Sequence, residues 1–144
     1  MKTQNAGILL LVVLTIFISA PVVSAGDFDW ARDLNIRAEA DPSGFRAQLS
    51  TRFKIGDTQV KVVLGNVDSP ADAYMVFRLG EMSSSPVDSV LNKYRTEKSK
   101  GWGALAKSLG ITPGSREFRA LKQSSDIYTN ENKKHKKSKS KGNV

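Results

Sequence analysis

The sequence predicts an α+β domain in which a three-stranded antiparallel meander comes first and three or four short helices follow. Apolar and polar residues alternate in three consecutive segments between residues 34 and 67. After Val67 the apolar residues recur every three or four positions instead, which is the spacing of helices. The end of the chain is polar and rich in lysine, so we expect a disordered basic C-terminal tail.

The three strands of the meander are expected to be joined by two short turns. The segment "LNIRAEA" (34–40) alternates, and the "DPSG" that follows it is typical of a type I turn. The segment "FRAQLSTRF" (45–53) alternates again. After the turn signal "IGDT", the segment "QVKVVLGNV" (59–67) alternates a third time.

The first of these strands has an alternative. Residues 28–40 could instead form a short helix, with Phe28, Trp30 and Leu34 as its apolar face. The sequence favours the second and third strands more clearly than the first.

The helical part begins with a pattern that occurs twice. The stretches "SPAD" (69–72) and "SPVD" (85–88) each place Ser at the N-cap, Pro at the first helical position and Asp in the first turn. Apolar residues at helical spacing follow both. A third helix is expected from Trp102 and should end at Gly110, and a fourth, short helix should follow the cap residue Ser115.

The N-terminal segment is typical of a signal peptide. Lys2 precedes a 13-residue apolar run from Ile8 to Ala20, and small residues lead to a cleavage site near Ala25. This run is shorter than the ~20 residues that span a bilayer as a helix, although a retained membrane anchor is the alternative. We therefore expect residues 1–25 to be removed and the mature chain to reach the periplasm or the exterior.

The expected mature chain consists of one domain and a cationic tail. Residues 26–67 form the meander part of the domain, residues 68–122 form its helical part, and residues 123–144 form the tail. The chain has a net charge of +8, but residues 26–132 contribute only +1 of it. Most of the remainder comes from six tail lysines, which are Lys133, Lys134, Lys136, Lys137, Lys139 and Lys141.

The composition leaves few routes to catalysis or to cofactor binding. The chain has no cysteine, and its one histidine, His135, lies in the tail, so neither a zinc site nor a histidine-activated nucleophile is expected. No glycine-rich phosphate-binding motif occurs. We therefore predict a non-enzymatic protein with no cofactor, no metal site, no catalytic residue and no small-molecule substrate.

Two basic features are candidate sites for polyanions. The tail lysines could bind anionic lipid, lipopolysaccharide or extracellular nucleic acid through counterion release. The polar face of the meander would bring together Arg37, Arg46, Arg52 and Lys61. For both features the alternative is a solvated surface without a partner.

Trp102 lies between two glycines in the stretch "KSKGWG" (98–103). An exposed tryptophan there could contact a partner protein. Its spacing to Leu105 and Leu109 equally fits a core position at the start of the third helix. Both interpretations stay open, and the second is favoured.

Residues 102–121 resemble the DNA-binding corner of helix-turn-helix proteins. The stretch "ALAKSLGITPGS" is similar to their first helix and turn. However, Arg116 stands where those proteins dock the second helix with an apolar residue, and the apolar positions come later, at Phe118 and Leu121. This shift rotates the second helix by roughly 200°. Together with the basic tail and the signal peptide, the resemblance implies a secreted or periplasmic nucleic-acid-binding protein as the alternative function.

The stretches "PVDSVLNKY" (86–94) and "KGWGALAKSLGI" (100–111) are similar to a module of small exported bacterial proteins that implies no particular activity. The resemblance implies a location in the envelope of a Gram-negative bacterium. The leading prediction is therefore a non-enzymatic exported envelope protein. It would be a small interaction or scaffold domain with an unknown envelope partner, and its cationic tail would be attracted to anionic surfaces.

Overall fold

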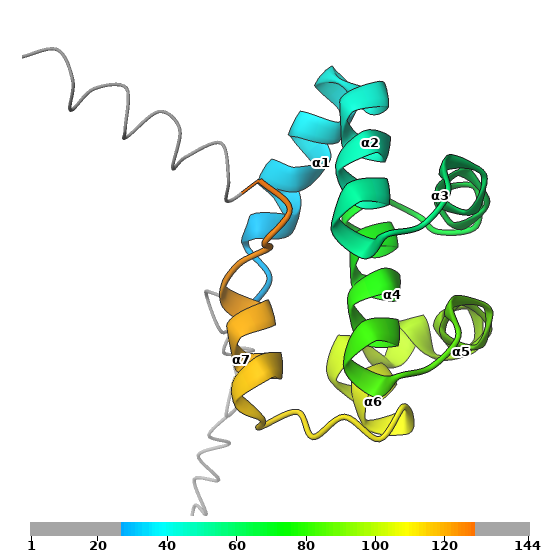
Figure 1. The fold of residues 1–144 in the computed structure, drawn as a ribbon. Coiled ribbons are helices and arrows are strands. Elements are labelled where there is room, and N and C mark those ends of the chain that lie inside the picture. Colours follow the sequence, from blue (N-terminus) through cyan, green and yellow to red (C-terminus); the bar gives the residue numbers. More distant parts are fainter. Residues whose placement is uncertain (1–26, 129–144) are drawn as a thin grey trace, which may run out of the picture.

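The computed structural model describes residues 27–128 and shows helices where the sequence predicts a sheet (Figure 1). Within this range there are seven α-helices, one 3-10 turn and no strand, so the predicted α+β fold is wrong. The elements are α1 (Trp30–Ala40), α2 (Pro42–Phe53), α3 (Asp57–Leu64), α4 (Pro70–Ser83), α5 (Val87–Glu97), η1 (Lys98–Lys100), α6 (Trp102–Ser108) and α7 (Arg116–Gln123). The predicted signal peptide and all six tail lysines lie outside the described residues.

The three predicted strands of the meander are α1, α2 and α3. In α1, Leu34 and Ala38 are buried at helical spacing, whereas Ile36 between them is 55% exposed. Val62 is likewise 50% exposed in α3. The alternation therefore includes residues that a helix turns to solvent. The first two segments also contain alanine and arginine, which favour helices, whereas the four valines of the third segment favour a strand locally. For residues 28–40, the alternative interpretation as a short helix is the correct one.

The two predicted turns are helix starts. Asp41 is the N-cap of α2, where its carboxylate accepts the backbone N–H of Gly44 at 2.9 Å, and Pro42 follows in the first turn. Gly56 precedes α3 in an extended conformation. An aspartate followed by proline suits both a turn and a helix N-terminus, so the local sequence alone does not separate the two.

Replacing Asp41 by alanine is expected to lower the free energy of unfolding by about 1 kcal/mol, because α2 loses its N-cap acceptor. Urea unfolding followed by far-ultraviolet circular dichroism measures the change. Glu39→Ala, which removes an exposed acid near the end of α1, is the control. An equal loss in the two variants would contradict the capping role.

The predicted helix boundaries after residue 67 are largely confirmed. Ser69 caps α4, accepting the N–H of Asp72 at 3.2 Å. The second pattern is displaced by one residue, because α5 begins at Val87 and no side chain caps it. Gly110 adopts a left-handed φ of 79° just after α6, and the Ser115 hydroxyl caps α7, both as predicted.

Helix α4 lies at the centre of the domain, between α1, α3 and α5 (Figure 1). Eight of its 14 residues are buried, as expected for a helix that other helices cover on several sides. None of the described helices has both the length and the apolar composition that crossing a bilayer requires.

Helix α7 is fixed to the N-terminal part of the domain. Phe118 is fully buried and meets the ring of Phe28 edge-on, at a centroid distance of 6.2 Å. The indole N–H of Trp30 donates to the carbonyl of Leu121 at 2.8 Å, and the N–H of Phe28 donates to the carbonyl of Lys122 at 2.8 Å. The second helix of the helix-turn-helix-like stretch is therefore held by residues far from that stretch in the sequence.

Candidate functional site

A cleft of about 320 Å³ lies where α4 begins, beside the end of α5 and the start of α6. We call it the Trp102 cleft. Its walls come from two short stretches of sequence, which the packing of α5 against α4 brings together. The lining residues are Asp68, Asp72, Tyr94, Lys98, Ser99 and Trp102.

Stacked aromatic rings form one wall of the Trp102 cleft. The rings of Tyr94 and Trp102 lie 5.6 Å apart between centroids, at an interplanar angle of 27°. Tyr94 is buried, whereas Trp102 is half-buried. Trp102 thus packs on the core and also borders the cleft, so the two interpretations of this residue are compatible.

Polar contacts on Tyr94 connect the two sides of the cleft. Its hydroxyl donates to the Asp72 carboxylate at 2.7 Å and accepts the backbone N–H of Asp68 at 3.1 Å. Burial raises the pKa of Tyr94 above its ordinary value, so the phenol stays neutral. Lys98 forms an ion pair with Asp68, and its ammonium lies 5.6 Å from the centroid of the Tyr94 ring. The hydrogen bond from Lys98 lowers the pKa of the exposed Asp68 carboxyl.

A second polar network holds the C-terminal end of the described chain against α2 and α4. We call the side chains of Arg52, Tyr74, Glu81 and Asp126 the C-terminal network. Tyr74 donates to the Asp126 carboxylate at 2.9 Å, and Arg52 donates to Asp126 at 2.7 Å and to Glu81 at 3.0 Å. Ile127 beside it is buried. Residues 123–128, which the sequence analysis assigned to the tail, therefore pack against the folded domain.

Burial and hydrogen bonding shift the ionisation of the C-terminal network in opposite directions. Burial raises the pKa of Tyr74 to about 12. Partial burial also acts to raise the pKa of Asp126, but hydrogen bonds from Arg52 and Tyr74 outweigh it and hold that pKa below its ordinary value. The hydrogen bond from Arg52 lowers the pKa of Glu81 in the same way. At neutral pH, Arg52, Glu81 and Asp126 are therefore charged, and Tyr74 is a neutral hydrogen-bond donor.

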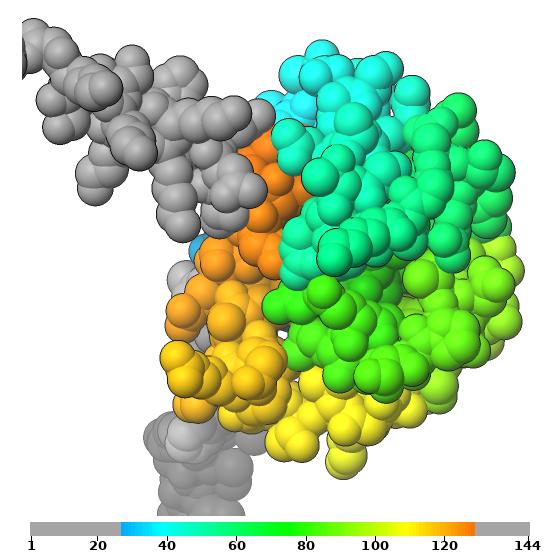
Figure 2. Space-filling view, in the orientation of Figure 1, coloured from blue at the N-terminus to red at the C-terminus, as the bar shows by residue number. Residues whose placement is uncertain are grey.

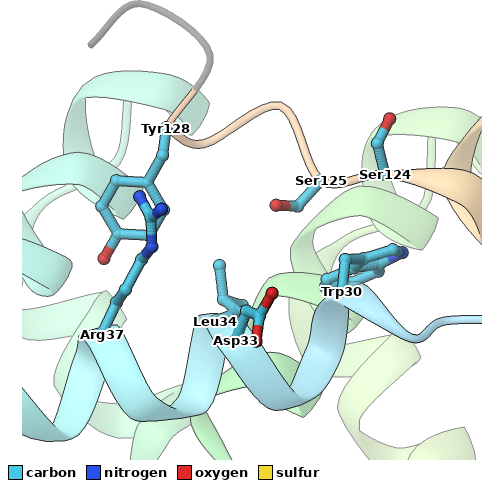
Figure 3. A pocket seen from close by; sticks show the side chains of 7 residues that line it. All are labelled: Trp30, Asp33, Leu34, Arg37, Ser124, Ser125 and Tyr128. Carbon is cyan, nitrogen blue, oxygen red and sulfur yellow. The ribbon is translucent and has the colours of Figure 1, made fainter. Parts of the chain in front are cut away.

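A smaller cleft, of about 160 Å³, lies between α1 and residues 124–128 (Figure 3). Figure 3 shows Arg37 reaching from α1 to the ring of Tyr128, and its guanidinium carbon lies 5.1 Å from the centroid of that ring. Trp30 and Leu34 line the cleft from the same helix. These contacts place the end of the described chain on α1.

The four basic residues predicted on the meander are not aligned by a sheet, because residues 27–128 form no strand. Arg37 lies over an aromatic ring (Figure 3). Arg46 and Lys61 both pair with Asp57, at 3.3 and 2.7 Å. Arg52 belongs to the C-terminal network. Each of these cations is already engaged inside the domain, so the predicted sheet-face site is not assembled.

The charge of the chain changes sign along the sequence. Residues 27–92 hold seven basic and ten acidic side chains, whereas residues 93–123 hold eight basic and two acidic ones. Among the described residues, most of these later cations form no ion pair, namely Lys93, Arg95, Lys100, Lys107, Arg116 and Arg119. Helices α5, α6 and α7 occupy the lower part of the domain (Figures 1 and 2). This division is hidden when the charge is summed over residues 26–132, which gives only +1.

Two further observations bear on function. Within residues 27–128, no three histidine, aspartate or glutamate side chains lie close enough together to hold a metal ion. Comparison of the chain with known protein families, with curated proteins and with solved structures finds no match.

Proposed function

We propose that the protein is a non-enzymatic exported protein that is retained on anionic surfaces of the bacterial envelope. The observation that carries this proposal is the excess of cations from α5 onward. Residues 93–144 hold 14 basic and four acidic side chains, a net charge of +10, whereas residues 27–92 carry −3. Each lysine or arginine near an anionic membrane contributes about 1 kcal/mol of attraction.

Helices α1 to α4, away from the anionic surface, would then remain available to an envelope protein. Helices α1 to α4 lie in the part of the sequence that is net acidic, so an anionic surface would repel them and attract α5, α6 and α7. This orientation is the basis for proposing an interaction or scaffold role for the domain. The tail lysines lie outside the described residues, so they support the proposal only by their number and charge.

The test is binding of the chain from Gly26 to Val144 to vesicles of phosphatidylglycerol and phosphatidylcholine. The double variant Lys107→Gln/Arg119→Gln is expected to lower the vesicle affinity about thirtyfold, because it removes two exposed cations from α6 and α7 at about 1 kcal/mol each. The matched control is Arg32→Gln/Lys54→Gln, which removes two exposed cations from the net acidic part. Equal losses in the two double variants would contradict the proposed orientation.

A nucleic-acid-binding function is the second candidate. It is supported by three exposed cations that form no ion pair within residues 27–128 and lie in the helix-turn-helix-like stretch, namely Lys107, Arg116 and Arg119. Against it, α7 is docked on Phe28 and Trp30, so its placement depends on the N-terminal segment.

Titration against random duplex DNA separates the two candidates. Binding is compared for chains that end at Val144 and at Asn132, at low and at physiological salt. If the shorter chain still binds at physiological salt, nucleic-acid binding becomes the leading function. If binding needs the tail and disappears with salt, the lysines act as a general attachment to polyanions.

A further inference from the structure

The Trp102 cleft combines an aromatic wall with two carboxylates, and this is the chemistry that binds organic cations. Its volume, about 320 Å³, lies at the lower end of the roughly 300–1,000 Å³ of ligand clefts. We propose that the cleft binds a lysine or arginine side chain presented by a polypeptide. This inference is independent of the proposed attraction to anionic surfaces, because it rests on the side chains that line one cleft and not on the net charge of α5, α6 and α7.

The rings of Tyr94 and Trp102 give the cleft an aromatic wall. Tyr94 and Trp102 are stacked and both line the cleft, and of the two rings the half-buried Trp102 is the more accessible. An ammonium or guanidinium group within about 6 Å of such a ring is attracted to its face.

The charges of the lining side chains do not cancel. Asp68 and Asp72 bring two negative charges, and Lys98 brings one positive charge. Among the described residues, Asp72 forms no ion pair, and the group that donates to its carboxylate from inside the cleft is the neutral phenol of Tyr94. The cleft therefore carries a net negative charge beside an aromatic face.

Lys98 already places a cation against the carboxylate and the aromatic ring of the cleft. Its ammonium binds the Asp68 carboxylate and lies near the face of Tyr94, as an incoming cation would. The side chains of Lys98 and Asp68 are 45% and 66% exposed, and Lys98 belongs to the one-turn helix η1. An exposed ion pair of this kind is weak, so a second cation can displace Lys98 or bind next to it.

The experiment follows the indole N–H resonances of the ¹⁵N-labelled chain from Gly26 to Val144. The probe is Nα-acetyl-lysine amide, and the same compound acetylated at Nε is the uncharged control. Trp102 is expected to shift saturably with the charged probe only. Trp30, whose indole N–H is bonded to Leu121, is expected to stay in place and to report an intact fold. Absence of a saturable shift at Trp102 would overturn the proposal.

Variants of the cleft test its chemistry. Asp68→Asn and Asp72→Asn are each expected to weaken probe binding about threefold or more, and the control Asp88→Asn, an exposed acid on α5, is expected to leave it unchanged. Lys98→Gln is expected to strengthen binding more than Lys100→Gln, which removes the same charge from η1 outside the cleft lining. Unchanged binding in Asp68→Asn, an exposed position, would overturn the proposal even if Asp72→Asn failed to fold.

The cationic side chain could come from the lysines of this chain or from another protein. Replacing all six lysines between residues 133 and 141 by glutamine separates the two sources. If the tail occupies the cleft, the variant shows a shifted Trp102 resonance without probe and a higher affinity for the probe. If the resonance is unchanged, the ligand is a basic segment of a partner protein.

Discussion

Replacing Phe118 by alanine is expected to lower the free energy of unfolding by about 3–5 kcal/mol, because a fully buried aromatic side chain is lost from the core. Phe118 packs against Phe28, so the cavity would open between α7 and the N-terminal segment. Urea unfolding followed by circular dichroism measures the change, and thermal unfolding should show a lower Tm.

The control for Phe118→Ala is Arg119→Ala, which changes the next residue of the same helix on its exposed side. This variant is expected to stay within about 0.5 kcal/mol of the parent chain. A loss below about 1 kcal/mol for Phe118→Ala would mean that α7 does not dock on Phe28. The helix-turn-helix interpretation of this stretch would then regain support.

Replacing Asp126 by asparagine is expected to lower the free energy of unfolding at neutral pH by about 1–3 kcal/mol, since the C-terminal network loses a charged acceptor. Arg52 and Tyr74 both donate to this carboxylate. The variant keeps the size of the side chain, so the loss reports the charge and the hydrogen bonds. Chemical unfolding at a series of pH values measures it.

The effect of Asp126→Asn should depend on pH in a defined direction. The pKa of Asp126 is lowered in the folded protein, compared with about 3.9 in an unfolded chain. A carboxyl with a lowered pKa stabilises the fold above the unfolded value, and this contribution disappears as the pH falls through the folded value. The difference between parent and variant should therefore shrink below about pH 4. A difference of the same size at low pH would contradict this account, and Asp88→Asn serves as the control.

The sequence predicts the helices whose starts have a single interpretation. Ser69 followed by proline, and Ser115 three residues before Phe118, cap helices as expected, whereas Ser85 in the same Ser-Pro pattern does not cap α5. The segment around Ile36 was predicted wrongly because alternate positions there are apolar while Leu34 and Ala38 are also four residues apart. A segment this short can satisfy both periods, and packing against α4 decides between them.

The candidate site was predictable only in part. Trp102 was singled out by its neighbouring glycines, and the change of charge at α5 could have been found by counting charges segment by segment. The bond from Tyr94 to Asp72 joins positions 22 residues apart, and the bond from Arg52 to Asp126 joins positions 74 residues apart. Pairs of this kind depend on how helices pack, and no local pattern in one sequence predicts them.

The hydrogen bond from Trp30 to Leu121 spans 91 positions and has a consequence for biosynthesis. A ribosome delivers the N-terminal end first, so Phe28 and Trp30 emerge long before the helix that covers them. Contacts among α1 to α4 can form early, because these helices are neighbours in sequence. The domain can close only after α7 has left the exit tunnel, and a nascent chain that stops before residue 116 exposes two aromatic side chains that a chaperone can recognise.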